Sequence, residues 1–526
     1  MAAAVLPWLN PMAGGPSAVV QPWLVAAALT LLLWAVVAPV VTRRDMGIGI
    51  LLAAALVGLG HAAPPVLLAV GGLIVIGVSA AVAASLGRAG DSFLIANAWL
   101  AAALVSSVLA IAQYFGLASD LAPWVNATSP GEAFANLRQR NQFATLTAIG
   151  LVALLWRVQH GARLGWAVPA AVLLAAANAG SASRTGAFQI VLVIGLAAWW
   201  LRPIHRGVTA VCFAAILAYG LAAMSFPHLV NHFWGVTVPN AFGRLASGDG
   251  CSSRGVLWSN VLHLIGQKPW LGWGWGELDY AHFATLYPGA RFCDILDNAH
   301  NLPLHLAVEL GVPVALLACA GFVAWVVWQR PWREADPTRC MAWAVIGVIL
   351  LHSLLEYPLW YGPFQMAFGF SLGLLVREPG KASGKLVGGT GRLAVSALLA
   401  CALLFTAWEY LRISQLYTVP EERSALFRHR PIPRIGDSWL FGDQVDFGLL
   451  SVTPLTQANA ADMNALALEL LHYSPEPRVI DSAIQSSIVL GREEQALWLL
   501  ERYRAAFPDD AAASAVASRP AAPVRN

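Results

Sequence analysis

Apolar residues dominate twelve stretches of the chain, and short polar connections separate most of them. Runs of this kind are typical of transmembrane helices, which need about 20 predominantly apolar residues to cross a bilayer. The stretches cover residues 19–41, 47–60, 64–85, 92–116, 141–157, 165–181, 185–201, 207–226, 303–328, 341–356, 361–376 and 393–411. The pattern predicts an all-α, polytopic membrane protein with about twelve transmembrane helices in residues 1–411.

The composition also indicates that lipid is the solvent for much of the chain. Of its 526 residues, 58% are hydrophobic and only 12% are charged. A soluble globular domain carries about 25% charged residues, so this charge cannot cover a water-facing surface of such a length. The net charge of +3 and the lack of any Lys/Arg-rich run argue against nucleic-acid binding.

Lysine and arginine are unevenly shared between the two alternating sets of connections. Fourteen lie in one set, which consists of short loops: Arg43, Arg44, Arg88, Arg157, Arg163, Arg202, Arg206, Arg330, Arg333, Arg339, Arg377, Lys381, Lys385 and Arg392. Seven lie in the other: Arg138, Arg140, Arg184, Arg244, Arg254, Lys268 and Arg291. Positive charge favours cytoplasmic loops. We therefore expect the long loop at 227–302 and the C-terminal region to face the periplasm or the cell exterior.

The C-terminal region, residues 412–526, returns to a soluble pattern. NALALELL and GREEQALWLLERYRAAFPDD carry apolar residues at helical spacing. Two such helices followed by a Pro-Asp stop resemble one tetratricopeptide-like pair, which cannot bury a core alone and must pack on neighbouring helices. We expect residues 1–411 and 412–526 to form two domains, with a disordered C-terminal end.

The arginines in the outer loops require an explanation, because the positive-inside bias disfavours positive charge in short loops on that side. Arg138 and Arg140 lie where a helix is predicted to begin, Arg184 lies in a tight connection, and Arg254 precedes a helical run. Guanidinium groups beside helix N-termini bind phosphate oxygens well. The ligand expected at this face is a lipid-linked pyrophosphate, although contact with phospholipid headgroups or plain solvation would explain any single arginine.

The long loop carries further candidates. Trp273, Trp275 and Glu277 belong to LGWGWGE, where glycines permit a tight backbone beside aromatic surfaces that could stack on sugars. Tryptophan is also enriched at membrane interfaces, which would explain both rings without a ligand. His300 and Asn301 precede a predicted helix; a neutral imidazole there could accept a proton from a hydroxyl, or it could simply cap the helix.

Three other features have both functional and plain interpretations. Pro358 and Pro363 break an apolar run and place Tyr357 at the outer face, as a functional group or as part of an interfacial aromatic belt. Asp294 and Asp297 lie near His300, but such spacing is common by chance, so we predict no metal site and no cofactor. Cys251 and Cys293 share the long loop and are expected to pair in an oxidising compartment, unless they stay unpaired.

Taken in order, five segments resemble the O-antigen ligase and polymerase superfamily. They are NLRQRNQFAT, SRTG, SRGVLW, GWGWGE and DNAHNLPLHLAVELG. The context of Gln139 before the fifth helix and the extended C-terminal region are most similar to bacterial protein O-oligosaccharyltransferases of the PglL type. The resemblance covers residues 5–410 strongly and the C-terminal region weakly.

The resemblance implies a membrane glycosyltransferase of the C type. Attack opposite the pyrophosphate leaving group should invert the anomeric centre, and because the sequence has no Asp-rich metal motif we expect the reaction to need neither a metal nor a cofactor. Such enzymes sit in the bacterial inner membrane and transfer a finished oligosaccharide from undecaprenyl pyrophosphate on the periplasmic side. Acceptors are Ser or Thr hydroxyls of proteins such as pilin, or lipid A core for the ligases. His300 matches the essential histidine, Arg184 and Arg254 match pyrophosphate-binding arginines, and Gln139 or Gln142 with Tyr357 matches polar positions important in the protein-directed branch.

The motif around Gln139 departs from the family, because Arg138 and Arg140 flank it where many relatives have smaller or uncharged residues. We expect Arg184, Arg254 and His300 to surround one cavity, with Trp273, Trp275, Glu277 and Asn301 contacting glycan or acceptor. An O-antigen ligase or polymerase is the nearest alternative. A transporter is a different class, disfavoured because the ionisable residues cluster at the outer face and no inverted repeat is detected.

Overall fold

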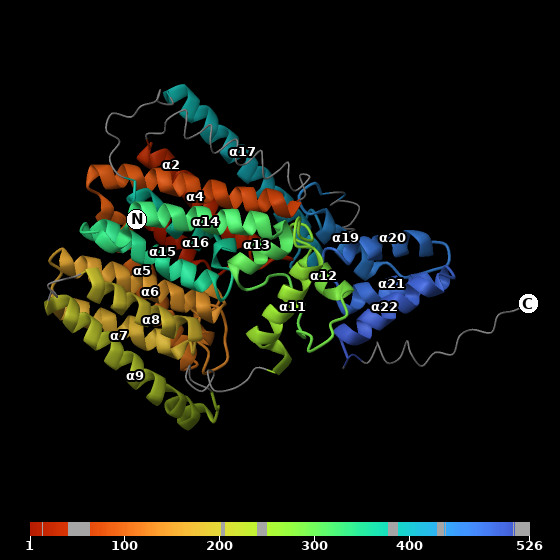
Figure 1. Ribbon diagram of the computed structural model, residues 1–526, viewed down its shortest axis with the longest axis horizontal. Helices are drawn as coiled ribbons and strands as arrows, with labels where there is room; N and C mark the ends of the chain where they lie inside the picture. Colours follow the sequence, from red (N-terminus) through yellow and green to blue (C-terminus); the bar gives the residue numbers. More distant parts are fainter. Residues whose placement is uncertain are drawn as a thin grey trace, which may run out of the picture. The chain divides into compact units, whose positions relative to one another are not determined.

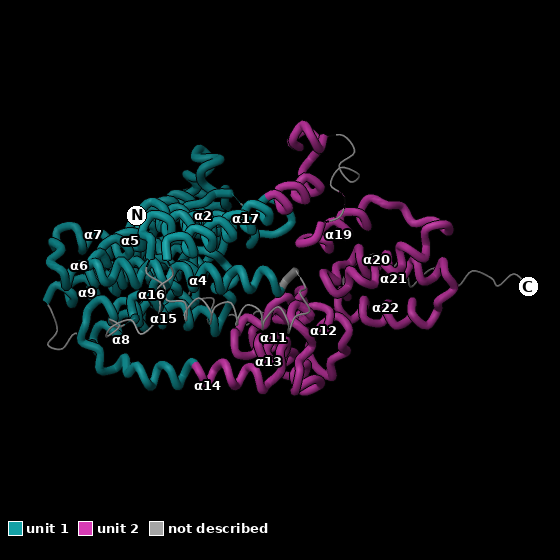
Figure 2. The backbone as a smooth tube through the Cα atoms, turned by 90° about the horizontal axis from the view of Figure 1, so that it is seen from above, with its two compact units in different colours: residues 1–248, 322–407 teal, residues 249–321, 408–526 magenta. Residues whose placement is uncertain are grey.

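Figure 1 shows the computed structural model, in which helices are the only regular elements of the described residues. The structure describes residues 1–12, 14–39, 64–200, 206–238, 250–376, 388–428, 436, 438–508 and 510. The predicted stretch at 47–60 lies outside them. The chain forms two compact units (Figure 2): unit 1 contains residues 1–248 and 322–407, and unit 2 contains residues 249–321 and 408–526.

Unit 1 is a helical bundle, and its long helices coincide with predicted apolar stretches. Its helices are α1 (Ala2–Leu9), α2 (Val20–Val37), α4 (Pro64–Ala89), α5 (Ser92–Tyr114), α6 (Arg140–Gln159), α7 (Leu164–Gly180), α8 (Arg184–Trp200), α9 (Arg206–Trp234), α15 (Pro337–Ser353) and α16 (Gly362–Leu374). Most of α17 (Gly389–Ser414) and the second part of α14 (Val312–Gln329) also belong to it.

Seven of the described helices are long and apolar enough to cross a membrane. They are α2, α4, α5, α6, α9, α14 and α17, and α7, α8 and α15 are shorter apolar helices. Large apolar side chains are also exposed on the outer faces of these helices, where contact with water would be unfavourable: Leu317 of α14 is 75% exposed, and Leu404 of α17 is 70% exposed. These features support a multi-pass membrane protein, while the expected number of about twelve spans stays a prediction.

Helix α6 lies at the centre of unit 1. It packs against α5, α7, α8 and α15, and nearly all of its residues are buried. The pair α4 and α16 is the most extensively packed, because glycines let the two backbones approach closely: a Cβ atom at Gly373 would lie 2.1 Å from the Ala80 carbonyl oxygen. Small residues at such crossings are characteristic of packed membrane helices. Close packing between these helices therefore holds the positions of their ends.

Two predicted helix boundaries were wrong. The apolar stretch at 303–328 is broken at Gly311 into α13 (Leu302–Leu310) and α14. Pro313 cannot donate to the Glu309 carbonyl and so favours a break, and Gly311 has φ 88° with a Cβ there lying 2.2 Å from the Trp270 carbonyl oxygen, so local sequence and tertiary packing both favour the break. Helix α9 continues eight residues beyond the predicted end at 226, because Pro227 is accommodated within it.

Unit 2 combines part of the long loop with the C-terminal region. The loop contributes α11 (Arg254–Gln267), α12 (Leu278–Ala284) and α13, and the C-terminal region contributes α19 (Gly442–Val452), α20 (Ala460–Leu470), α21 (Pro477–Val489) and α22 (Glu493–Ala506). Helices α20, α21 and α22 pack in succession, and Phe283 of α12 enters their core. Residues 249–321 of the long loop therefore pack with the C-terminal region as one unit. The division expected at residue 411 was drawn from the change in hydropathy and does not separate these packed units.

Candidate active site

The start of α6 holds three of the predicted site residues in unit 1. Gln139 is the N-cap of α6, and its side-chain oxygen accepts a hydrogen bond from the Gln142 backbone N–H at 2.6 Å. The Arg138 guanidinium donates to the Pro11 carbonyl, and Arg140 pairs with Glu132 at 2.7 Å. In this structure all three side chains thus contact protein groups, and their roles toward a donor stay predictions.

Arg184 and Tyr357 lie at two neighbouring helix ends of the same unit. Arg184 is the first residue of α8, and the preceding Ser183 accepts from the Gly186 backbone N–H at 2.9 Å. Tyr357 occupies the turn between α15 and α16, where its ring stacks on that of Tyr361 with centroids 6.0 Å apart. Both Arg184 and Tyr357 are half-buried.

A hydrogen-bonded chain brings these ends of α6, α8 and α15 together. The Ser183 hydroxyl donates to Asn141 Oδ1 at 2.5 Å, and Asn141 Nδ2 donates to Glu356 Oε1 at 3.2 Å. Gln139, Arg184 and Tyr357 each lie within two residues of a member of this chain. Unit 1 therefore gathers its predicted site residues at one end of the bundle.

Unit 2 holds Arg254 at the start of α11 and His300 just before α13. Arg254 begins α11, whose N-cap Ser253 accepts from the Val256 backbone N–H at 3.3 Å. His300 directly precedes Asn301, the N-cap of α13, whose side chain accepts from the Leu304 backbone N–H at 3.1 Å. Helices α11 and α13 pack against each other, so unit 2 fixes the two residues on a shared scaffold.

The His300 backbone is held in an uncommon conformation. Its φ of 49° is left-handed, and its N–H donates to Asn298 Oδ1 at 2.9 Å. The Trp258 indole N–H donates to the Ala299 carbonyl at 3.2 Å, which ties α11 to the segment before His300. Left-handed residues other than glycine persist where the surroundings hold them, and they often mark functional sites.

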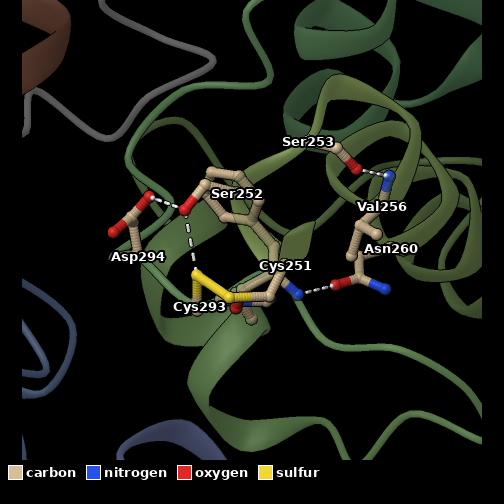
Figure 3. The surroundings of a disulfide bond; sticks show 9 residues. Cys251, Ser252, Ser253, Val256, Asn260, Cys293 and Asp294 are labelled. Carbon is tan, nitrogen blue, oxygen red and sulfur yellow. Dashed lines mark hydrogen bonds between the residues drawn. A yellow bond between two sulfur atoms is a disulfide. The ribbon is translucent and has the colours of Figure 1, made fainter. Parts of the chain in front are cut away.

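A disulfide joins the start of α11 to the segment that leads to His300. Cys251 and Cys293 are bonded, and the Ser252 hydroxyl donates to Asp294 Oδ2 at 3.0 Å (Figure 3). Asn260 on α11 adds a second link, since its Oδ1 accepts from the Phe292 backbone N–H at 2.8 Å. These covalent and polar links hold two segments 42 residues apart in sequence side by side.

The Gly-Trp segment runs along the end of α13. The backbone N–H groups of Trp273 and Gly274 donate to the carbonyls of Val308 and Glu309 at 2.8 and 3.0 Å. The buried Glu309 side chain accepts from the Gly276 N–H at 2.9 Å. Sequence reasoning missed Glu309, although a lone carboxylate four residues after His305 in an apolar run is a signal for a buried polar anchor.

The side chains predicted to contact glycan or acceptor differ in their surroundings. Trp273 packs in unit 2, with its indole N–H on the Leu264 carbonyl at 3.0 Å and the Lys268 ammonium over its ring. The Trp275 ring lies 5.6 Å from that of His305. Glu277 pairs with His472 at 2.6 Å, which connects the segment to the C-terminal helices of the same unit. Their contacts with glycan or acceptor remain predictions.

His282 of α12 is buried between two polar partners. Its Nε2–H donates to the Phe292 carbonyl at 3.1 Å, and its Nδ1 accepts from the Tyr287 hydroxyl at 2.8 Å, so the neutral ring is fully hydrogen-bonded. Burial, and then the charge of Arg291, lowers the pKa of His282 from 6.5 to about 3. The His282 imidazole is therefore uncharged in the folded protein, and protonation of this ring would oppose folding of the segment.

Acid is expected to destabilise unit 2 through His282. The folded pKa is below the unfolded one, so this contribution is complete above pH 6.5 and is lost as the pH falls toward 3, by up to about 1.4 kcal/mol per pH unit. His282→Gln, which cannot become charged, should flatten this dependence. Hydrogen exchange of residues 278–293 between pH 7 and 4.5 measures it, and the same slope in both proteins would contradict the assignment.

The wild type must be compared with His282→Gln because Asp279, also buried on α12, adds a pH dependence of its own. Burial, opposed in part by the hydrogen bond from the Tyr280 backbone, raises the pKa of Asp279 well above its usual value. Its stabilising contribution is lost as the pH rises, which is the opposite sign to that of His282. The difference between the wild type and His282→Gln isolates the histidine.

The expectation that Arg184, Arg254 and His300 surround one cavity stays a prediction. Arg184 lies in unit 1, and Arg254 and His300 lie in unit 2. Among the described residues, no group of three or more His, Cys, Asp and Glu side chains is arranged to hold a metal ion.

Three segments of the chain match known families. Residues 133–158 match the protein glycosylation ligase family, residues 169–319 match the O-antigen ligase family, and residues 340–522 match the C-terminal region of virulence factor membrane-bound polymerases. The first segment contains Gln139, the second contains Arg184, Arg254 and His300, and the third contains Tyr357.

Two curated relatives come from Acinetobacter baylyi. The general O-oligosaccharyltransferase is 28% identical over 283 residues, which are 52% of this chain and 49% of the relative. The ComP-specific O-oligosaccharyltransferase is 26% identical over 333 residues, which are 62% of this chain and 59% of the relative. The chain thus spans between half and three fifths of the curated relatives it matches. No solved structure matches it. The chain is therefore homologous to PglL-type O-oligosaccharyltransferases and carries the O-antigen ligase segment, which confirms the resemblance found in its motifs.

Proposed function

We propose that this protein is an O-oligosaccharyltransferase of the bacterial inner membrane. It moves a preassembled glycan en bloc from undecaprenyl pyrophosphate to Ser or Thr hydroxyls of periplasmic proteins such as pilin. The observation that carries the proposal is the match of residues 169–319, which contain Arg184, Arg254 and His300, to the O-antigen ligase family, in a chain with two relatives named O-oligosaccharyltransferases.

In the proposed reaction, the His300 imidazole takes the proton of the acceptor hydroxyl. The hydroxyl oxygen bonds to the anomeric carbon as the bond from that carbon to the pyrophosphate oxygen breaks, so the anomeric configuration inverts. Arg184 and Arg254, assisted by Arg138 and Arg140, stabilise the negative charge of the departing undecaprenyl pyrophosphate. Gln139 and Tyr357 act as polar groups at the same end of unit 1 as Arg184.

The C-terminal helices are assigned to the acceptor. Helices α19 to α22 would form a tetratricopeptide-like module that holds an acceptor protein on the periplasmic side, while Trp275, Glu277 and Asn301, with Trp273, would contact glycan or acceptor. The pair between Glu277 and His472 supports this division of roles, because it connects the two parts within unit 2.

An O-antigen ligase or polymerase is the second candidate. The segments at 169–319 and 340–522 favour it, since they match the O-antigen ligase family and the polymerase C-terminal region. The match of residues 133–158 to the protein glycosylation ligase family, together with both relatives, favours transfer to protein. A transporter has no comparable support.

Deletion of the gene separates these functions. Intact masses of periplasmic and pilin proteins, and the lipopolysaccharide pattern on gels, should be compared between deletion and complemented strains. Loss of glycan from proteins with unchanged lipopolysaccharide supports the proposal. Unchanged proteins with truncated lipopolysaccharide would instead establish the ligase or polymerase function.

Transfer is expected to be independent of metal ions. Pyrophosphate is a good leaving group, and arginines can supply the positive charge that other glycosyltransferases obtain from a divalent ion. Purified protein with lipid-linked donor should keep its rate in excess chelator. A complete loss of transfer that a divalent ion restores would overturn this expectation.

A further inference from the structure

We propose that Asn141 is a positioning residue for glycosyl transfer, which fixes the ends of α6, α8 and α15 that carry Gln139, Arg184 and Tyr357. The inference rests on the proposed function. The family matches give Asn141 no role, and the sequence motifs did not single it out.

The Asn141 amide uses both of its ends, with opposite polarity. Its Oδ1 accepts from the Ser183 hydroxyl at 2.5 Å, and its Nδ2 donates to Glu356 Oε1 at 3.2 Å. The Ser183 oxygen in turn accepts from the Gly186 backbone N–H at 2.9 Å. The result is a directed chain of hydrogen bonds that runs from the start of α8, across α6, to the turn after α15.

Every member of this chain adjoins a predicted site residue. Ser183 directly precedes Arg184, Glu356 directly precedes Tyr357, and Asn141 follows Gln139 by two positions. A change in the Asn141 amide would therefore move the backbone at Arg184 and Tyr357 together. Misplacement of groups by about 1 Å can lower catalytic rates strongly, so such a link would affect donor binding and turnover.

A second polar layer, one turn deeper, holds the same three helices without Asn141 side-chain contacts. Thr145 Oγ1 lies 2.9 Å from His352 Nδ1 and accepts from Gln189 Nε2 at 2.8 Å. Gln189 also donates to the Val348 carbonyl at 3.0 Å, and all three side chains of this layer are buried. Substitution of Asn141 should thus disturb the helix ends and leave the bundle folded.

The polarity of the link permits a reversal experiment. Asn141→Asp keeps the bond from Ser183 but places a second carboxylate against Glu356, so donor kcat/KM should fall roughly 10-fold or more. In Asn141→Asp/Glu356→Gln the Gln amide can donate to the new carboxylate, and kcat/KM should return to within about threefold of the wild type. Asn231→Asp, at an exposed position on α9, is the matched control for the added charge and should keep wild-type activity.

The assay uses full-length protein in nanodiscs, with lipid-linked oligosaccharide extracted from the deletion strain and that strain's periplasmic proteins as acceptors. Thermal unfolding of each variant checks folding. Equal losses in Asn141→Asp and the double variant, with wild-type melting temperatures, would overturn the positioning role, and so would wild-type kinetics in Asn141→Asp. If the wild-type protein transfers no glycan from the lipid-linked donor to protein in this assay, the proposed function fails instead, whatever the Asn141 variants do.

Discussion

Replacement of His300 by alanine is expected to abolish glycan transfer while the protein stays folded. In the proposed reaction a positioned base contributes roughly 10² to 10⁴ in rate, and alanine cannot take the hydroxyl proton. His300 is half-buried and held in position by the Asn298 side chain and by the N-cap of α13. Intact mass of acceptor proteins in a complemented deletion strain measures the loss.

The left-handed backbone at His300 calls for a second variant. Alanine tolerates φ 49° less well than asparagine, so a small loss of stability could accompany His300→Ala. His300→Asn suits that backbone conformation but lacks a base, and it should be equally inactive. His232→Ala, at an exposed position on α9, is the matched histidine control and should transfer normally. Full glycosylation by either His300 variant would remove this residue from the mechanism.

Hydropathy predicted the membrane helices well because each depends on a local property, the run of apolar residues. Helices occupy the predicted stretches that the structure describes, from α2 to α17. Hydropathy did not show the break at Gly311, since the residues around it are apolar; the local signal was Gly311 followed by Pro313, and the close approach of the Trp270 carbonyl adds a non-local cause. In the C-terminal region the spacing predicted α20 and α22. Helix α21 was missed, although Val479, Ile480, Ala483 and Ile484 lie at helical spacing and Pro477 marks its start, so its sequence carried a local signal as well.

The candidate site was predictable as a set of residue types and only partly as an arrangement. Arg184 and Arg254 lie at helix starts, as expected, because Ser183 and Ser253 precede them and serine favours the N-cap. The bonds from Asn141 to Ser183 and Glu356 join residues 42 and 215 positions apart, which no local pattern encodes. The packing of Phe283 into the C-terminal helices is equally non-local.

Alanine at Arg184 or Arg254 should weaken binding of the lipid donor. A guanidinium at the first position of a helix adds a fork of donors to the backbone N–H groups there, and loss of two charge-assisted bonds to phosphate corresponds to roughly 100-fold in affinity. Lysine should rescue only part of this, since an ammonium cannot bind in a fork. Arg206→Ala, at the exposed start of α9, is the matched control.

The two arginines are expected to differ from His300 in kinetics. Loss of a pyrophosphate contact should raise the KM for the donor as well as lower kcat, because the phosphates carry charge before and after the glycosidic bond breaks, whereas loss of the base should lower kcat with little change in donor KM. Binding of lipid-linked oligosaccharide to each variant, measured without acceptor, separates the two cases. Unchanged donor affinity in both Arg184→Ala and Arg254→Ala would exclude the phosphate assignment, while loss in only one would confine the donor site to that unit.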